Sequence, residues 1–334
     1  MTKTDTMQAA VLEQFKTPLR LRQLPKPVPH AGQVLVRILA SGVNPLDVKI
    51  RAGAAAHAKV QTPAILGLDL AGVVEAVGAG VDRFKRGDEV YGMTGGVGGV
   101  QGSLAEYAAV DADLLAIRPA NLTAREAAAL PLIFITAWEG LVDRAQVQRG
   151  RKVLIQGGAG GVGHVAIQIA QARGASVFAT VSASQSQVVE SFGATAIDRV
   201  AMSVEGYVAR YADGDGFDIV YDTVGGAVLD ASFEAVRPYE GRVVSCLGWG
   251  THALAPLSFR GATYAGVFTL RPLLTGRHRR HHGEILQEAT KLAEKGLLRP
   301  ILDARHFTLD SLAAAYESIE THSNTGKIVI DIGG

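Results

Sequence analysis

Two rhythms of apolar and polar residues divide the chain. Between residues 42 and 102, short apolar runs alternate with glycine turns every ~8–12 residues, a pattern typical of a small all-β unit. From about residue 150, continuous apolar runs alternate with amphipathic stretches, which predicts a parallel sheet buried on both faces by helices. We therefore expect an α/β protein in which a β-rich part precedes a doubly wound part.

The pattern also predicts the individual elements. A long helix is expected from residue 123 to about 145, because Thr123 can cap its first turn and Glu126 has the capping-box spacing. The expected strands are 33–40, 71–77, 89–92, 104–110, 152–156, 176–181, 194–197, 217–221, 242–247 and 327–332. The other expected helices are 161–173, 184–192, 228–236, 283–295 and 309–320.

The strongest local motif follows the predicted strand 152–156 and opens the predicted helix 161–173. It has the G-x-G-x-x-G spacing at Gly158, Gly160 and Gly163, within a βαβ unit of ~30 residues. We expect Gly158 to permit a tight turn, Gly160 to let a pyrophosphate approach the backbone, and Gly163 to let helix and strand pack closely. The alternative is a glycine turn with a purely structural role. The context favours a dinucleotide site over that alternative.

The end of the predicted strand 176–181 bears on which dinucleotide binds. An acid there would bond a ribose 2′-hydroxyl and repel a 2′-phosphate, and the sequence has no acid before Glu190. Hydroxyls at Ser182 and Ser184 could donate to a phosphate, and Arg199 could reach the same corner from the next strand. Helix capping is the ordinary alternative for the serines. The missing acid favours NADP(H).

Composition narrows the class of protein. The formal net charge is +1, which gives no reason to expect a nucleic-acid partner. Cys246 is the single cysteine and lies in an apolar stretch, so we expect a reducing compartment and an inert thiol. The apolar stretch 127–142 is interrupted by Pro131 and Glu139, which argues against a membrane span. A cytoplasmic location is the expectation.

With these segments in place, the whole chain resembles the medium-chain dehydrogenase/reductase superfamily, within its quinone oxidoreductase branch. The likeness rests on four blocks, at residues 40–53, 63–78, 84–92 and 102–107. The resemblance implies a GroES-like catalytic domain at 1–122, a Rossmann domain at 123–260, and a tail at 261–334 that returns to the first domain. Relatives are commonly dimers, so it also implies a homodimer, with 257–268 as the pairing edge strand.

The resemblance also bears on metal. In metal-bearing relatives a cysteine stands at the position of Asn44 and a His-Glu pair at Leu68 and Asp69, and a four-cysteine lobe follows Tyr91. This chain lacks all of these ligands. Zinc needs three or four suitable ligands in tetrahedral array. We therefore expect no structural or catalytic zinc.

The resemblance places Asn44 near the nicotinamide, where its amide could donate to a substrate carbonyl; the alternative is a turn role before Pro45. Thr136 is expected against the nicotinamide ribose, or else bonded within its own helix. Asp47 and Arg51 are expected to pair as scaffold, and Lys327 either approaches the cofactor or starts a strand. The expected catalytic residue is Asn44, and the expected cofactor contacts are Asn44, Thr136, Gly158, Ala159, Gly160, Gly161, Val162, Gly163, Ser182, Ser184, Arg199, Thr223, Leu247 and Lys327.

The expected reaction follows from the absence of metal. Without a Lewis acid, reduction of an unactivated ketone is harder, whereas quinones and α,β-unsaturated carbonyls delocalise the incoming negative charge themselves. We therefore expect hydride transfer from NADPH to a quinone or enone. The alternatives are a 2-enoyl-thioester reductase and a dinucleotide-binding protein without turnover.

Overall fold

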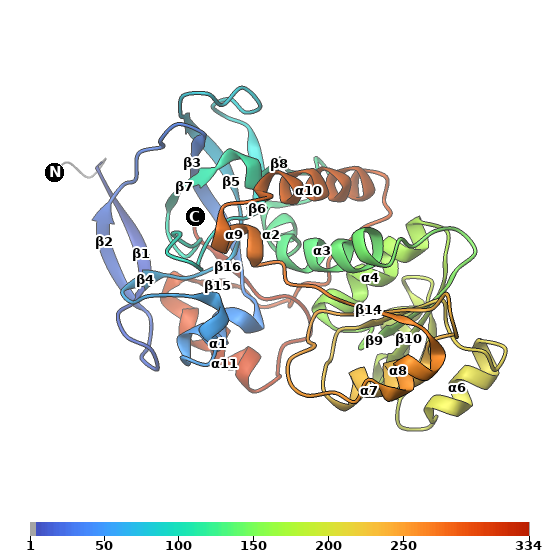
Figure 1. Cartoon of the computed structure of the whole chain (residues 1–334). Helices are drawn as coiled ribbons and strands as arrows, with labels where there is room; N and C mark the ends of the chain where they lie inside the picture. The colour runs from blue at the N-terminus through green and yellow to red at the C-terminus, as the bar shows by residue number, and fades with distance from the viewer. Residues whose placement is uncertain (1–4, 334) are drawn as a thin grey trace. The chain divides into compact units, whose positions relative to one another are not determined.

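The computed structural model describes residues 5–333 and divides the chain into two compact units. The first consists of Met1–Leu132 with Leu270–Gly334, and the second of Ile133–Thr269 (Figure 1). The first segment of the first unit ends at Leu132, ten residues after the expected boundary at 122. The second unit ends at Thr269, nine residues after the expected boundary at 260. The expected domains, with boundaries at residues 122 and 260, stay a prediction.

Two antiparallel-rich sheets form the first unit. A three-stranded sheet has the order β2-β1-β4, and a larger sheet has the order β15-β16-β3-β5-β6-β8, with β7 pairing β3. The strands are β1 (Thr6–Leu12), β2 (Arg20–Pro25), β3 (Gln33–Gly42), β4 (Ala64–Ile65), β5 (Asp69–Val77), β6 (Glu89–Met93), β7 (Tyr107–Asp111), β8 (Leu115–Ile117), β15 (Phe307–Thr308) and β16 (Val329–Asp331). Apolar residues of the central strands bury one face of this sheet, as alternation along a strand requires.

Helices from both ends of the chain cover these sheets. They are α1 (Pro45–Arg51), η1 (Ala56–Ala58), η2 (Ala112–Leu114), α2 (Ala124–Ala128), α9 (Arg271–Thr275), α10 (Arg279–Glu294), η5 (Leu309–Ser311) and α11 (Leu312–Glu320). The Tyr91 hydroxyl of β6 donates to the Leu286 carbonyl of α10 over 2.7 Å. This bond is one of those by which the tail joins the first unit.

The second unit is a single parallel sheet with the order β11-β10-β9-β12-β13-β14. Its strands are β9 (Lys152–Gln156), β10 (Ser176–Val181), β11 (Thr195–Asp198), β12 (Ile219–Asp222), β13 (Arg242–Ser245) and β14 (Thr263–Gly266). The helical segments are α3 (Pro131–Trp138, beginning at the end of the first unit), η3 (Glu139–Arg144), α4 (Gly161–Ala172), η4 (Ala183–Gln185), α5 (Ser186–Glu190), α6 (Val204–Tyr211), α7 (Ala227–Ala235) and α8 (Ala255–Arg260). The expected α/β fold with a β-rich and a doubly wound part is confirmed.

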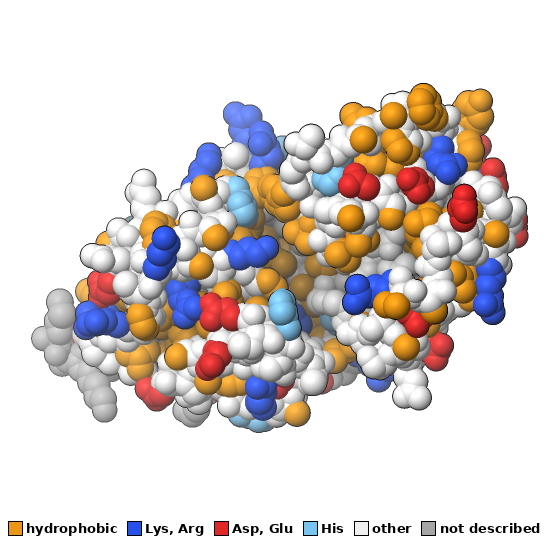
Figure 2. All heavy atoms as spheres, turned by 90° about the horizontal axis from the view of Figure 1, so that it is seen from below, with side chains coloured by type: hydrophobic (Ala, Val, Ile, Leu, Met, Phe, Trp, Pro, Cys, Tyr) orange, Lys and Arg blue, Asp and Glu red, His pale blue; other side chains and the backbone are white. Residues whose placement is uncertain are grey.

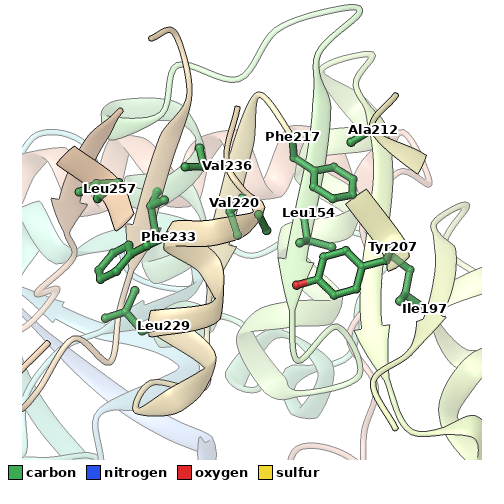
Figure 3. Close-up of a cluster of buried hydrophobic side chains, with 12 residues drawn as sticks. Leu154, Ile197, Tyr207, Ala212, Phe217, Val220, Leu229, Phe233, Val236 and Leu257 are labelled. Carbon is green, nitrogen blue, oxygen red and sulfur yellow. The ribbon is translucent and has the colours of Figure 1, made fainter. Parts of the chain in front are cut away.

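A buried cluster holds one face of the parallel sheet against its helices. Leu154 from β9 and Val220 from β12 contribute strand side chains, and Phe233 contributes from α7 (Figure 3). The rings of Tyr207 and Phe217 lie 6.2 Å apart beside Leu154. Continuous apolar strands are expected when both faces of a parallel sheet are covered.

Three predicted elements were wrong in extent. The long helix expected over 123–145 is instead α2, α3 and a π-helical turn, η3. The break precedes Pro131, which has no N–H to continue the bonding of α2. The edge strand expected over 257–268 is α8 followed by the four-residue β14, because Gly261 adopts a left-handed conformation that ends α8. The strand expected over 104–110 begins at Tyr107.

The sequence pattern did not predict α1, α6 or the β1–β2 hairpin. The helix expected over 283–295 begins earlier, at Arg279, as α10, and His282 in its first turn is buried. Short helices such as α1 carry too little periodicity to be recognised against irregular segments.

The surface shows mixed charge. On the face seen in Figure 2, Lys and Arg side chains are interspersed with Asp and Glu side chains. Within residues 5–333, no helix has the length and apolarity needed to cross a membrane.

Candidate functional site

The turn between β9 and α4 owes its shape to glycines. Gly157 has φ +73°, the left-handed region that glycine favours, so it makes the tight turn that was expected of Gly158. A Cβ on Gly158 would lie 2.6 Å from the Ala179 Cβ, and one on Gly163 would lie 2.2 Å from the Gly157 carbonyl oxygen. Both glycines therefore let the turn pack against its neighbours.

Gly160 differs from these glycines because the space beside it is open. A Cβ there would meet only the Gly157 carbonyl oxygen, at 3.3 Å. Gly160 and Gly161 are exposed, and Ala159 and Val162 are partly exposed. The first backbone N–H groups of α4 have no partners within the helix, and the positive end of its dipole lies here. The turn thus offers bare backbone donors at the carboxyl end of β9, which is how a pyrophosphate is held.

The neighbouring corner brings together the residues expected at a 2′-phosphate. Val181 and Asp198 are register partners at the ends of β10 and β11, and the Arg199 N–H donates to the Val181 carbonyl over 3.1 Å. Arg199 is exposed, and it follows Asp198 directly, as Ser182 follows Val181. The Ser182 hydroxyl is 3.2 Å from that of Ser184 and donates to the Gln185 side chain over 2.9 Å. The corner therefore has two hydroxyls and one cation.

On the other side of β9, a buried carboxylate shapes the segment after β12. Asp222 accepts N–H bonds from Val224 and Gly225 at 3.0 and 2.9 Å and a hydroxyl bond from Ser245 at 2.6 Å. Thr223 bonds the Gln156 carbonyl over 2.7 Å, beside the turn. The sequence reading missed Asp222, although an Asp followed by Thr-Val-Gly-Gly is a recognisable turn signal.

The next two strands in the sheet order are β13 and β14; Leu247 follows β13, and Tyr264 lies in β14. The Leu247 N–H donates to the Ser245 hydroxyl over 3.0 Å, at the end of β13. The Tyr264 hydroxyl lies against Gly248, since a Cβ there would be 2.2 Å away. Burial raises the pKa of Tyr264. Burial also raises the pKa of Cys246 to about 12, consistent with the expected inert thiol.

Thr136 is held inside the second unit. Its hydroxyl lies 3.2 Å from that of Thr269, and its carbonyl accepts a 2.7 Å bond from the Tyr221 hydroxyl. The Thr136 hydroxyl therefore reaches beyond its own helix.

The second group of candidate residues lies in the first unit and is a buried polar cluster. The Asn44 amide donates from Nδ2 to Asp69 Oδ2 over 2.9 Å, and Asn44 Oδ1 accepts from Lys327 Nζ. Lys327 Nζ also donates to the Val43 carbonyl over 2.9 Å. Asp47 accepts the Asn44 backbone N–H over 2.8 Å. Asn44 and Asp47 are each 1% exposed and Asp69 is 0% exposed.

Burial dominates the electrostatics of this cluster. Desolvation raises the pKa of Asp47 to about 7 against the lowering effect of the Asn44 N–H. Desolvation likewise raises the pKa of Asp69 to about 6, opposed mainly by the Lys327 charge. Burial lowers the pKa of Lys327. The raised pKa favours the protonated form of Asp47 over a wider pH range than that of an exposed aspartate.

The expected pairing of Asp47 with Arg51 was wrong. Arg51 forms an ion pair with Glu320 of α11. The Asp47 carboxylate instead accepts the backbone N–H of Asn44, the residue that caps the N-terminus of α1. Lys327 is buried just before β16 and contacts Asn44. The two residues are far apart in the sequence, so this contact was not predicted.

The structure therefore groups the expected site residues in two places. Asn44 and Lys327 are bonded to each other in the first unit. The remaining cofactor candidates belong to the second unit, most of them around the carboxyl ends of β9 to β13: Thr136, Gly158, Ala159, Gly160, Gly161, Val162, Gly163, Ser182, Ser184, Arg199, Thr223 and Leu247. Among residues 5–333, no three His, Cys, Asp or Glu side chains are grouped so that they could hold a metal ion.

Two family models match the chain. One is described as an alcohol dehydrogenase GroES-like domain and matches residues 30–120. The other is described as a zinc-binding dehydrogenase and matches residues 192–330. They correspond to the β-rich part and to much of the remainder of the chain.

Named relatives extend the match over most of the chain. A 2-methylene-furan-3-one reductase of Solanum lycopersicum is 38% identical, over 89% of this chain and 71% of the relative. A chloroplastic NADPH-dependent alkenal/one oxidoreductase of Arabidopsis thaliana is 35% identical, over 89% of this chain and 72% of the relative. The crystal structure of an alcohol dehydrogenase superfamily protein from Novosphingobium aromaticivorans superposes with a TM-score of 0.96 at 59% identity, covering 98% of this chain and 100% of that one.

The buried Asp47 carboxyl makes stability depend on pH. The folded state holds its proton up to a pKa of about 7, whereas an unfolded aspartate releases it near ~3.9. Wild-type stability therefore falls as pH rises between these values, by at most about 1.4 kcal/mol per pH unit from this group.

Asp47→Asn has no titrating carboxyl at this position. We therefore expect its unfolding free energy, relative to that of the wild type, to increase as pH rises from about 4 to about 7. Urea unfolding at several pH values measures the difference. Asp82→Asn, at an exposed position, is the matched control. A difference between Asp47→Asn and wild type that stays flat or falls with pH would contradict the assignment.

Proposed function

This chain belongs to the medium-chain dehydrogenase/reductase superfamily, and we propose that it reduces quinones or α,β-unsaturated carbonyl compounds with NADPH and without zinc. The observation that carries this proposal is the bare backbone turn between β9 and α4, open beside Gly160 at the carboxyl end of a parallel strand. The reaction is NADPH plus acceptor plus a proton, giving NADP⁺ and the reduced acceptor. The bound nicotinamide supplies the hydride.

The cofactor contacts follow from the sheet order. The backbone of Gly158, Ala159, Gly160, Gly161, Val162 and Gly163 would hold the pyrophosphate, with the dipole of α4 favouring its charge. The adenosine half would extend over the end of β10, toward Ser182, Ser184 and Arg199. The nicotinamide half would extend the other way, toward Thr136, Thr223 and Leu247 beside β12 and β13. Lys327 is the remaining candidate contact and lies in the first unit.

NADP(H) is the proposed form of the cofactor. A 2′-phosphate needs hydrogen-bond donors and positive charge, and the corner after β10 has the Ser182 and Ser184 hydroxyls with Arg199 across from them. The Arabidopsis relative is named as NADPH-dependent, which supports the same choice.

Asn44 is proposed as the catalytic residue. Its Nδ2 carries two hydrogens, one of which bonds Asp69. The other is available to a substrate carbonyl, where negative charge develops as the hydride arrives. Because Asn44 is shielded from water, such a bond would form in surroundings of low dielectric, where it stabilises charge most strongly.

Independence of zinc is supported by the charge already present. Lys327 Nζ is bonded to Asn44 Oδ1 and acts electrostatically on Asp69. Asn44 and Asp69 stand at positions where metal-bearing relatives have the cysteine and part of the His-Glu pair. A second cation would be repelled by this ammonium group. Asn44 is also a poor ligand for zinc, which prefers sulfur and imidazole.

The acceptor class follows from the same chemistry. With one amide donor, the site stabilises an oxyanion less strongly than a metal does, so the acceptor itself must delocalise charge. The relatives named as an alkenal/one oxidoreductase and a furanone reductase support an enone. A cytoplasmic location of this chain stays a prediction, since the Arabidopsis relative is designated chloroplastic.

An acceptor panel tests the function. We expect the purified chain to oxidise NADPH with an enone or a quinone at a kcat/KM at least ~10-fold above that with the matching saturated ketone, because only conjugated acceptors spread the charge. Absorbance of the reduced nicotinamide follows the reaction. A preference for crotonyl-CoA would favour the thioester reductase, and NADPH binding without oxidation by any acceptor would favour a binding protein.

Two glycine variants test the turn. Gly160→Ala adds a methyl group to open space, so we expect a Tm near wild type and NADPH affinity weakened at least ~10-fold. Gly163→Ala places its methyl group against the Gly157 carbonyl and should lower the unfolding free energy by about 1–3 kcal/mol. Calorimetric titration and thermal unfolding measure both. Undiminished NADPH affinity in Gly160→Ala would refute a pyrophosphate at this turn.

The proposed phosphate corner predicts a change in cofactor preference. Arg199→Gln removes the cation, so we expect the KM for NADPH to rise ~10-fold while that for NADH stays within ~2-fold. Arg210→Ala is the matched control, because Arg210 is exposed in the last turn of α6, which leads to the amino edge of the sheet. Equal changes for both cofactors would remove Arg199 from the phosphate site.

We also propose a homodimer formed through β14. This strand ends the sheet order and leaves one edge unpaired among the described strands. Beside it lie two strongly exposed aromatic side chains, Phe259 at 88% and Tyr239 at 85%. The Tyr239 N–H donates to the Arg260 carbonyl, which joins the two segments. An unpaired edge beside exposed apolar rings is suited to isologous pairing.

Phe259→Asp would bury a charge in that interface, so we expect it to be monomeric where the wild type is dimeric. Light scattering after size exclusion measures the mass. Val200→Asp, at an exposed apolar position next to β11, should stay dimeric. A monomeric wild type, or a dimeric Phe259→Asp, would contradict the proposed edge.

A further inference from the structure

The Asn44 amide lies between two groups of opposite charge. Lys327 Nζ has only donors and faces Oδ1, whereas an ionised Asp69 has only acceptors and faces Nδ2. We propose that Lys327 and Asp69 are positioning residues that hold the Asn44 amide in one orientation and leave its second Nδ2 hydrogen to an acceptor carbonyl. This inference rests on the proposed catalytic role of Asn44.

Three adjacent strands bring these residues together. Gly42 of β3 is the register partner of Asp69 in β5 on one side and of Val329 in β16 on the other. Lys327 comes two residues before Val329, and Asn44 comes two residues after Gly42. The Val43 N–H donates to the Ile328 carbonyl over 2.9 Å, which continues the pairing toward Asn44. The sheet therefore sets both flanking groups independently of the side chain between them.

The surrounding backbone is fixed as well. Asp69 Oδ1 accepts the Leu132 N–H over 2.9 Å, so its other oxygen is directed at Asn44. Asp47 holds the Asn44 backbone N–H. With backbone, Oδ1 and one Nδ2 hydrogen all engaged, a flip of the amide would set two donors against each other at Lys327 and two acceptors at Asp69.

Stability alone is a weak reason for such a cluster. Desolvation of a buried ammonium and carboxylate offsets much of their attraction, so apolar residues of similar size often stabilise a fold as well. An amide held by opposite charges gains a defined orientation, which a catalytic hydrogen bond requires.

Selective labelling gives a direct readout without turnover. The chain has three asparagines, Asn44, Asn121 and Asn324, so ¹⁵N-asparagine labelling yields three side-chain amide pairs. We expect Lys327→Met and Asp69→Asn each to shift the Asn44 pair, and the spectrum of Asp69→Asn to contain a fourth pair from position 69. The pairs of Asn121 and Asn324, bonded to the Ala293 and Gly326 carbonyls, should stay in place as internal controls. An unchanged Asn44 pair in both variants would overturn the proposal.

The double variant separates orientation from stability. Each single variant removes one partner of the Lys327–Asp69 pair and should lower Tm, whereas Lys327→Met/Asp69→Asn removes both charges of the pair and should recover much of the loss. We expect kcat with an enone to stay at least ~10-fold below wild type in the double variant, close to that of Asn44→Ala. Recovery of kcat together with Tm would show a purely structural cluster and overturn the proposal.

Tyr91→Phe supplies the matched control. It removes a buried hydroxyl bond to Leu286 in the same unit, so it should lower Tm while leaving kcat near wild type. A wild-type chain that reduces no acceptor would contradict the proposed function. The amide spectra would still decide whether Lys327 and Asp69 orient Asn44.

Discussion

The backbone at the end of β9 has to stay bare, and the second unit is arranged around that requirement. Gly157 turns the chain, Gly158 and Gly163 let it press against β10 and itself, and Gly160 leaves open space above the first N–H groups of α4. A side chain at position 160 would extend into this open space, beside the positive end of the helix dipole. The parallel order of the strands then aligns the ends of β10, β12 and β13 with the turn, so one extended ligand can meet all of them.

The first unit differs from the second because it buries charged side chains away from solvent. Hydrogen bonds join Asn44 to Asp47, Asp69 and Lys327, and the bonds to Asp69 and Lys327 link segments that are distant in sequence. The consequence is an Asp47 carboxyl whose pKa is raised by burial and an Asn44 amide whose two ends face Lys327 and Asp69. In the proposed reaction this arrangement would supply one oriented donor, which suits acceptors that delocalise charge themselves.

Sequence patterns predicted the central strands of the parallel unit well because these strands are continuous apolar runs, whereas the exposed edge strand β14 was misplaced. The strands 152–156 and 176–181 begin and end where expected, and Thr123 caps its helix through Glu126. Long-range contacts were out of reach, since nothing near Lys327 in the sequence points to Asn44. The tight turn was assigned to Gly158 instead of Gly157, because motif spacing does not report φ. Asp47 was paired with Arg51 on helical spacing, whereas burial of its carboxylate decided the outcome.

Amide hydrogen exchange with and without NADPH tests the central claim most directly. If the dinucleotide rests on the bare backbone, saturating NADPH should slow exchange at least ~10-fold in the peptide that covers residues 157–163, with a smaller effect at the ends of β12 and β13. Exchange in that peptide that is unchanged at saturation, with protection elsewhere in the chain, would contradict the account.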